Sequence, residues 1–257
     1  MWDIRENQSH AVRRASASLH QFNARHPWSH NDHFHGWILR RLPRRDGGGP
    51  IRVLDVGCGR GALVGRLRER GAAVVGIDVD AGMARAAAAR HAGDTGVRIA
   101  HTAFEEVSGT YDTITMVASL HHMPLDAALT RASDLLAPGG RLLVVGLARV
   151  GSLPEAMIDL ASSFANPVVG LVRHPRPVSP HDSPSETASV TTVLTTESTD
   201  STDSTDSTDS TEPAMPARDP DETYSEVAAT AARVLPRARF RQRLFFRYTL
   251  EWARPGA

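Results

Sequence analysis

The feature that most constrains this chain is a glycine-rich turn between a buried strand and a helix. The segment from Val53 to Leu63 reads Val-Leu-Asp-Val-Gly-Cys-Gly-Arg-Gly-Ala-Leu. Glycines at such a turn let the backbone approach a ligand closely and expose the amides that begin the following helix. A second apolar run, from Val74 to Ile77, ends in the carboxylate of Asp78. A carboxylate here can accept hydrogen bonds from both hydroxyls of a ribose, so the pattern predicts a site for a nucleoside-like ligand.

Short apolar runs alternate with helical stretches through the middle of the chain. We predict strands over 51–56, 73–77, 97–100, 113–117 and 141–146, separated by helices near 62–70, 82–91 and 126–136. This alternation predicts an α/β fold with a parallel sheet and helices on both faces. Near the C-terminus, a helix over 224–234 and a strand pattern within 238–252 could add an antiparallel hairpin to the sheet edge.

The glycine turn alone leaves the ligand open. Gly57, Gly59 and Ala62 also satisfy the fingerprint of dinucleotide-binding proteins, which permits alanine at its last position. An NAD(P)-dependent oxidoreductase is therefore one interpretation, and an enzyme that uses S-adenosylmethionine is another.

Further residues favour the second interpretation. Asp55 lies directly before Val56 and Gly57 in a run that reads Asp-Val-Gly-Cys-Gly-Arg-Gly, and Pro138-Gly139-Gly140 precedes the fifth predicted strand. Together with the ribose acid, this order resembles the class I S-adenosylmethionine-dependent methyltransferases over residues 51–146, and more faintly over 247–252. The resemblance implies a Rossmann-like, doubly wound and mostly parallel seven-stranded sheet with an antiparallel C-terminal strand, and S-adenosylmethionine as cofactor. The ammonium group of that cofactor would explain Asp55, for which a dinucleotide offers no role.

The resemblance also implies roles for individual residues. It places the methionine part of the cofactor against Asp55, Gly57, Cys58 and Gly59, the ribose on Asp78, and the adenine against Val79 and Met83. Related enzymes often carry an acid after the third strand, and here the corresponding residue is Ala103, so we expect backbone atoms and the ring of Phe104 to meet the adenine. A shift in register would instead bring Glu105 there. Ala118 begins the segment that borders the reacting methyl group.

Two histidines follow the fourth predicted strand. Methyl transfer is an in-line displacement, so the protein mainly aligns the nucleophile and excludes water. His121 or His122 could take a proton from an oxygen or nitrogen nucleophile, because histidine titrates near neutral pH. The alternative is that both histidines only cap or pack the following helix.

A second cluster of histidines and aromatic residues precedes the glycine turn. We interpret residues 1–45 as an N-terminal helical cover over the active site, in which Trp28, His30, His33 and Phe34 would contact substrate. Simple helix packing is the alternative. We expect no metal site, because no set of cysteine or nearby acidic ligands completes one.

The remaining expectations concern domains and partners. The methyltransferase domain is predicted over 51–257, with a helical lid over 153–174 and a disordered Ser/Thr/Asp-rich insertion over 175–220 that carries the repeat Ser-Thr-Asp. The 29 basic and 29 acidic residues cancel, which disfavours a nucleic-acid partner. With one cysteine, no secretory leader after Met1 and no apolar span free of charge, we expect a cytoplasmic enzyme without membrane contact.

The predicted function is methyl transfer to an O, N or C nucleophile of a small molecule, with a role in the biosynthesis of a specialised metabolite. A catalytically inactive methyltransferase-like binding protein is a further alternative. The sequence leaves the substrate and the oligomeric state open.

Overall fold

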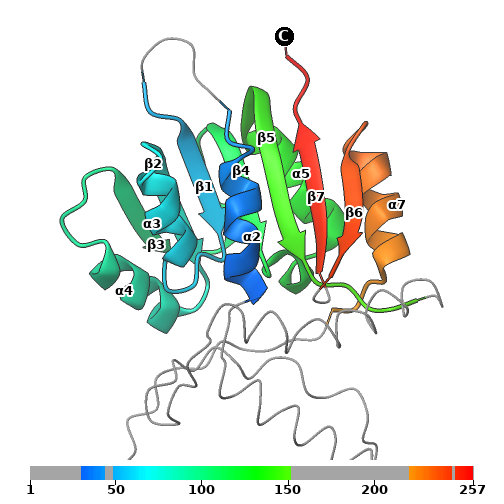
Figure 1. The fold of residues 1–257 in the computed structure, drawn as a ribbon, viewed down its shortest axis with the longest axis horizontal. Coiled ribbons are helices and arrows are strands. Elements are labelled where there is room, and N and C mark those ends of the chain that lie inside the picture. The colour runs from blue at the N-terminus through cyan, green and yellow to red at the C-terminus, as the bar shows by residue number, and fades with distance from the viewer. Residues whose placement is uncertain (1–29, 44–48, 152–219, 245–246, 257) are drawn as a thin grey trace, which may run out of the picture.

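The computed structural model describes residues 30–43, 49–151, 220–244 and 247–256. These residues form a seven-stranded sheet with the order β3-β2-β1-β4-β5-β7-β6 (Figure 1). Strand β7 runs antiparallel to both of its neighbours, β5 and β6, and the other neighbouring pairs in this sheet are parallel. The predicted fold, a mostly parallel sheet with an antiparallel C-terminal strand, is confirmed. The strands are β1 (Arg52–Val56), β2 (Ala73–Asp78), β3 (Val97–His101), β4 (Tyr111–Val117), β5 (Leu136–Gly146), β6 (Arg239–Arg243) and β7 (Arg247–Ala253).

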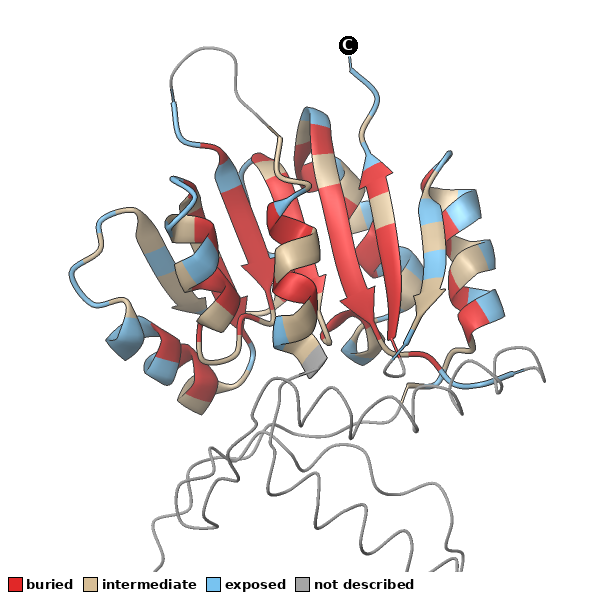
Figure 2. Ribbon diagram, viewed as in Figure 1, coloured by how far each residue is buried: buried red, intermediate tan, exposed pale blue. Residues whose placement is uncertain are grey.

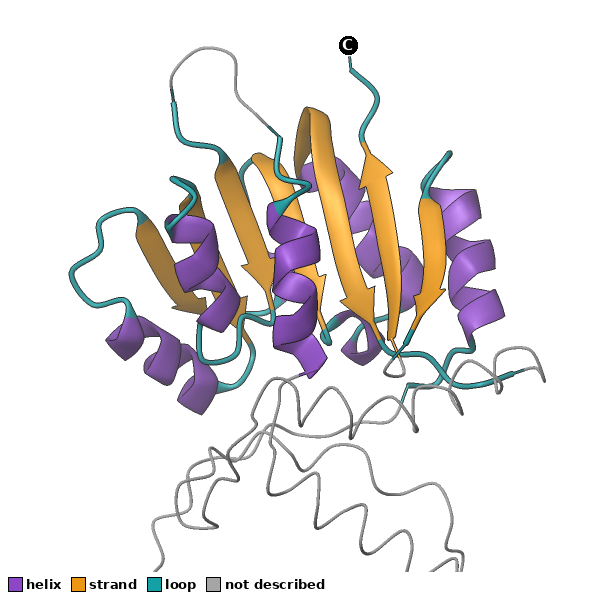
Figure 3. Ribbon diagram, viewed as in Figure 1, coloured by secondary structure: helices purple, strands orange, loops and turns teal. Residues whose placement is uncertain are grey.

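Helices cover both faces of the sheet (Figure 3). Residues in β5 alternate between the two faces, so that Leu143 and Val145 pack in one core with α2 and α3, while Leu142 and Val144 pack in the other with α5 and α7. The central strands are therefore buried on both sides (Figure 2), which is why they read as continuous apolar runs. The helices are α2 (His30–Leu39), α3 (Ala62–Arg68), α4 (Ala81–Arg90), α5 (Leu125–Leu135) and α7 (Tyr224–Val234), with short 3-10 turns η1 (Phe104–Glu106) and η2 (Leu120–His122).

Side-chain caps fix where two of these helices begin. Thr223 forms a capping box with Glu226, in which each side chain bonds the other residue's backbone amide, and α7 starts at the next residue. Asp80 caps α4 by accepting a hydrogen bond from the amide of Met83 at 2.8 Å. The predicted range 224–234 for α7 matches the structure residue for residue.

Strand β5 departs from its predicted start. It begins at Leu136 rather than Arg141, and the pairing with β4 shifts so that Tyr111 faces Leu136 while Thr113 faces Arg141. The Pro-Gly-Gly run therefore lies inside the strand as a bulge instead of preceding it. Gly139 has a φ of 75° and donates its amide to the carbonyl of Arg254, which ties the bulge to the residue after β7.

Several predicted segments lie outside the described residues. They include most of the N-terminal cover, the lid over 153–174 and nearly all of the insertion over 175–220. The described segments on either side of residues 152–219 are joined, because Arg149 pairs with Thr223 in an isolated bridge. Within the residues that the structure describes, no helix has the length and apolar character needed to cross a membrane.

Candidate functional site

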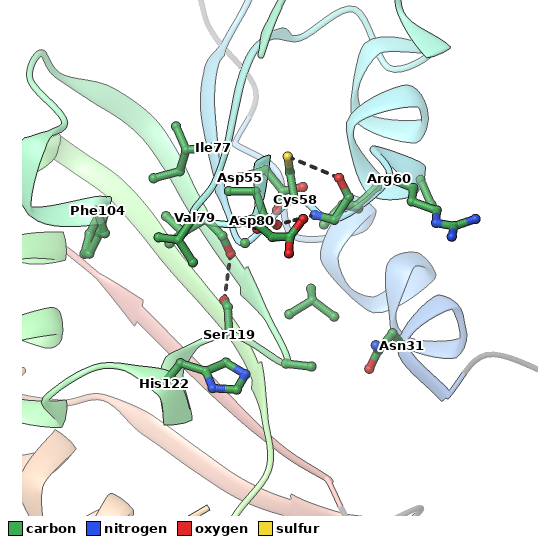
Figure 4. A pocket seen from close by; sticks show the side chains of 18 of the residues that line it. Asn31, Asp55, Cys58, Arg60, Ile77, Val79, Asp80, Phe104, Ser119 and His122 are labelled. Atoms are coloured by element: carbon green, nitrogen blue, oxygen red, sulfur yellow. Dashed lines mark hydrogen bonds between the residues drawn. The ribbon is translucent and has the colours of Figure 1, made fainter. Parts of the chain in front are cut away.

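A pocket of about 630 Å³ lies at the edge of the sheet where the parallel strands end. Its walls come from the segments that follow β1, β2, β3 and β4, and from the first turns of α2. This is the edge at which ligands bind in open α/β sheets. Figure 4 shows Val79, Ile77 and Phe104 on one side of the pocket, with Asn31 and Arg60 on the other and His122 below.

The glycine turn after β1 is held tightly against β2 and against the segment after β4. The amides of Gly57 and Cys58 both donate to the carbonyl of Ile77 at 2.9 Å. Gly57 has a φ of 70°, and a Cβ added to it would lie 2.5 Å from the Cβ of Ser119. Ser119 is fixed in turn, because its hydroxyl donates to the carbonyl of Val56 at 2.7 Å. Only glycine suits position 57, both for its backbone conformation and for its space.

Asp78 at the end of β2 is oriented by backbone amides. Gly59 donates its amide to Oδ2 of Asp78 at 2.8 Å, and Asp80 donates its amide to Oδ1 at 2.9 Å. The residue is only 8% exposed, yet it lines the pocket. Each carboxylate oxygen can accept a second hydrogen bond, so the side chain remains able to receive two hydroxyl donors from a ligand.

Asp55 lies deeper in the same pocket and has fewer partners. It is 2% exposed, and the hydroxyl of Thr115 donates to its Oδ1 at 2.6 Å. Burial raises the pKa of Asp55 to about 7, the hydrogen bond from Thr115 lowers it, and the charge of Asp78 raises it. A cation placed beside Asp55 would favour its ionised form and relieve the cost of burying that charge.

Cys58 also lines the pocket, and its thiol stays protonated. Burial and the nearby carboxyls of Asp55 and Asp78 raise the pKa of the thiol far above its usual range. Cys58 therefore contributes shape and backbone to the turn rather than a nucleophile.

The loops after β2 and β3 form an apolar side of the pocket. Val79 is 69% exposed, whereas Phe104, which lines the same pocket, is buried. The pocket does not include Met83 or Ala103, although both were predicted to meet the adenine. Met83 is a buried residue of α4. Ala103 precedes the turn η1, whose residues Phe104 and Glu105 line the pocket instead.

The two histidines after β4 differ in their position. His122 lines the pocket and is exposed, whereas His121 lies outside the lining. Their rings are adjacent, with centroids 4.0 Å apart. The preceding Ala118 lines the pocket with a φ of 54°, a strained conformation for alanine that accompanies functional sites. The geometry therefore separates the two predicted catalytic candidates.

Helix α2 presents a different face to the pocket from the predicted one. Phe34 is buried in the core, and His33 packs edge-on against it with centroids 5.0 Å apart, so neither lines the pocket. Trp28 and the side chain of His30 lie outside the described part of the chain. The lining residues of α2 are Asn31, Asp32 and His35.

His35 and Asp32 form a contact within this helix. Nε2 of His35 lies 3.5 Å from Oδ1 of Asp32. Burial lowers the pKa of His35, while the charge of Asp32 raises it and that of Arg66 lowers it. Among the described residues, no group of at least three histidine, cysteine or acidic side chains is arranged to hold a metal ion.

Comparison with known proteins assigns the family. A family model described as a methyltransferase domain matches residues 54–142. An uncharacterized methyltransferase of Mycobacterium tuberculosis (strain ATCC 25618 / H37Rv) is 34% identical over 160 residues, which cover 59% of this chain and 78% of that protein. The chain belongs to the class I S-adenosylmethionine-dependent methyltransferases.

Other similar methyltransferases cover different shares of this chain. The ubiquinone biosynthesis O-methyltransferase of Pseudomonas aeruginosa (strain LESB58) is 36% identical over 115 residues, which cover 42% of this chain and 47% of that protein. The crystal structure of magnesium protoporphyrin IX methyltransferase from Synechocystis PCC 6803 with bound S-adenosylhomocysteine aligns with 18% identity and a TM-score of 0.48, covering 87% of this chain and 81% of that chain.

The residues present fit the cofactor of the methyltransferase family. Buried Asp55 suits the ammonium group, Asp78 keeps acceptor capacity for the ribose, and exposed Val79 offers an apolar surface for the adenine. All three residues line a single pocket. The interpretation as an NAD(P)-dependent oxidoreductase is accordingly set aside, because the family is that of methyltransferases.

Sequence reasoning missed several lining residues of this methyltransferase. Asp80 lines the pocket three residues after a predicted strand end, and this position is the signal that could have found it. Asn31 and His35 are four residues apart and so share one helix face, but the sequence alone did not indicate which face of α2 meets the pocket.

Proposed function

We propose that this methyltransferase moves a methyl group from S-adenosylmethionine to an O, N or C nucleophile of a small molecule, in the biosynthesis of a specialised metabolite. One observation carries the proposal: the pocket with Asp55 and Asp78 continues without interruption to His122 and to the first turns of α2. A small acceptor could therefore lie beside the cofactor in the same cavity. The balanced charge of the chain supports a small acceptor over a nucleic acid.

We propose the following roles for the residues that bind the cofactor. Asp55 attracts the ammonium group, and the turn Gly57–Gly59 lets the methionine part approach the backbone. Asp78 accepts hydrogen bonds from the ribose, and Val79 and Phe104 pack against the adenine. When bound, the cofactor supplies a methyl group that its sulfonium activates, so these residues act by alignment and by excluding water.

At the acceptor end we propose His122 as the group that takes the proton from an oxygen or nitrogen nucleophile. His122 lines the pocket, while its neighbour His121 does not. Imidazole can accept a proton near neutral pH, and a positioned base accelerates such a step about 10²- to 10⁴-fold. For a carbon nucleophile, His122 would serve the same purpose wherever a C–H proton is removed.

The test combines binding with turnover. Calorimetry should show binding of S-adenosylmethionine and S-adenosylhomocysteine but not of NAD. Transfer of labelled methyl from S-adenosylmethionine to a panel of phenols, amines and activated methylenes should then yield an acceptor. With that acceptor, His122→Asn should lower kcat at least about tenfold, whereas the matched His121→Asn should retain most of the activity. Binding without turnover on any acceptor would favour an inactive binding protein.

A further inference from the structure

The start of β7 and the first turn of α2 meet beside the pocket. Nη2 of Arg247 donates a hydrogen bond to Oδ1 of Asn31 at 3.1 Å. Asn31 lines the pocket, and Figure 4 shows its side chain facing the interior from α2. The two residues are 216 positions apart in the sequence, so the fold alone brings them together.

This hydrogen bond determines which end of the Asn31 amide faces a ligand. A guanidinium group has donors and no acceptor, so the atom that meets Arg247 must be the amide oxygen. The nitrogen Nδ2 is then the polar atom that Asn31 presents to the pocket. Because Nδ2 can only donate, the ligand group beside it must be a hydrogen-bond acceptor.

Arg247 adds a positive charge behind this donor. The residue is 6% exposed and lies beside Tyr224. Burial lowers the pKa of Arg247 to about 10 and the neighbouring Tyr224 raises it, so the guanidinium is charged at neutral pH. A charge shielded from solvent acts more strongly at short range than one at the surface. The donor of Asn31 is therefore best matched by an acceptor that is negatively charged.

The position of the pair indicates which part of the pocket it serves. Along the sheet edge, Asp78 ends β2, the glycine turn follows β1 and His122 follows β4. Arg247 begins β7 beyond β5, at the level just past Gly146, which pairs with Tyr248. Arg247 thus lies across β1, β4 and β5 from the ribose acid, toward the methionine and acceptor end.

We propose that Asn31, oriented by Arg247, is a specificity-determining donor that selects a ligand carrying a carboxylate at this end of the pocket. The inference rests on the proposed function, because it takes the pocket to hold a cofactor and an acceptor. The carboxylate belongs either to the methionine part of the cofactor or to the acceptor. Asn31 contacts the carboxylate, and Arg247 is a positioning residue that acts through Asn31.

The first arm of the test examines the cofactor. Calorimetry compares S-adenosylhomocysteine with S-adenosyl-3-thiopropylamine, which lacks only the carboxylate. If the methionine carboxylate is the partner, the wild-type protein binds S-adenosylhomocysteine at least tenfold more tightly. Asn31→Leu, which keeps the shape and removes the donor, should abolish this difference without changing the affinity for the decarboxylated compound.

The second arm examines the acceptor. Acetate, benzoate and indole-3-acetate, each paired with its neutral primary amide, are titrated into protein saturated with S-adenosylhomocysteine. If the acceptor supplies the carboxylate, the wild-type protein binds at least one acid at least tenfold more tightly than its amide. Asn31→Leu and Arg247→Met should both remove that preference.

Arg241→Met is the matched control, because it removes one positive charge at an exposed position on the neighbouring strand β6 and does not alter the pocket lining. It should leave both preferences unchanged. If Arg247→Met lowers the melting temperature, its binding result is not used, and the result for Asn31→Leu alone decides between the outcomes. If the variants lose the preference for the carboxylate in either arm, the inference is supported, and that arm shows whether the carboxylate belongs to the cofactor or to the acceptor. Variants that match wild type in both arms overturn the inference. A wild-type protein that does not bind S-adenosylhomocysteine would instead refute the proposed function.

Discussion

The difference in free energy of unfolding between the Asp55→Asn variant and wild type should change in favour of the variant as the pH rises from 5 to 8. Asparagine keeps the shape of the side chain and can still accept the hydrogen bond from Thr115, but it carries no charge. Burial raises the pKa of Asp55 from the ordinary value of 3.8 to about 7 in the folded protein. A raised pKa means that the folded state holds a proton which the unfolded state has already lost. Stability therefore falls as the pH rises from 3.8 toward 7.

The size of the effect follows from the linkage between protonation and folding. At pH 5 the unfolded carboxyl is ionised and the folded one is protonated. From there to pH 7 wild type loses stability at up to about 1.4 kcal/mol per pH unit, and above pH 7 the loss levels off. Between pH 5 and pH 8 the free energy of unfolding of Asp55→Asn should therefore rise by about 2.5 kcal/mol relative to that of wild type. Any constant cost of the substitution shifts the whole curve and leaves this slope intact.

Urea denaturation of both proteins at several pH values between 5 and 8 measures this difference. Asp134→Asn, at an exposed position on α5, is the matched control and should run parallel to wild type. Calorimetric titration should show the opposite consequence for function: S-adenosylmethionine affinity rises with pH in wild type, because its ammonium favours ionised Asp55, and stays flat and weaker in Asp55→Asn. Parallel stability curves for wild type and Asp55→Asn would refute the assignment of a buried, proton-linked Asp55.

Further variants probe the other parts of the site. Asp78→Ala should weaken S-adenosylmethionine binding by about 1.5 to 3 kcal/mol in calorimetry while the fold survives, because charge-assisted hydrogen bonds to the ribose are lost; unchanged affinity would contradict the assignment. Gly57→Val should abolish binding, since its Cβ would meet Ser119 at 2.5 Å, whereas Gly71→Val, at a glycine with similar φ and no neighbour within 4 Å, should cost stability only. Deleting residues 198–211 should leave the melting temperature and S-adenosylmethionine affinity nearly unchanged, because loop-closure entropy varies slowly with length. A deletion variant that lost cofactor binding would place that segment in the site.

The strand-turn-helix core of the fold could be predicted because its signals are local. The capping box of Thr223 and Glu226 begins α7 where the sequence indicated, and the alternation of apolar runs predicted each central strand. Strand β5 was predicted too short, because Pro138 and two glycines read as a turn. Hydrogen bonds to Arg254 hold these residues inside the strand. Arg254 lies more than a hundred residues away in the sequence, so no local sequence pattern could predict this pairing.

Which face of α2 meets the pocket could not be predicted either, for the same reason. Aromatic and imidazole side chains made His33 and Phe34 attractive as substrate contacts, but Phe34 is needed to fill the core with Ile38, one turn further on. That packing sets the rotation of the helix and turns Asn31 and His35 toward the pocket. Periodicity predicts that a helix has two faces, whereas the assignment of a face to the core depends on the surfaces of α3 and β5 that it meets.

Asp55 and Asp78 illustrate what the fold adds to residues that the sequence did single out. Both were predicted as cofactor-binding acids, and nothing in the chain distinguished their protonation. In the structure Asp78 accepts two backbone amides, whereas Asp55 has the hydroxyl of Thr115 and almost complete burial. These environments are consistent with the roles proposed above, in which Asp78 accepts hydrogen bonds from hydroxyl groups and Asp55 pairs with a cation. Burying an ionised Asp55 costs stability near neutral pH, and under the proposed function a positively charged ligand relieves this cost. Stability and cofactor binding should therefore respond in opposite directions when Asp55 is replaced.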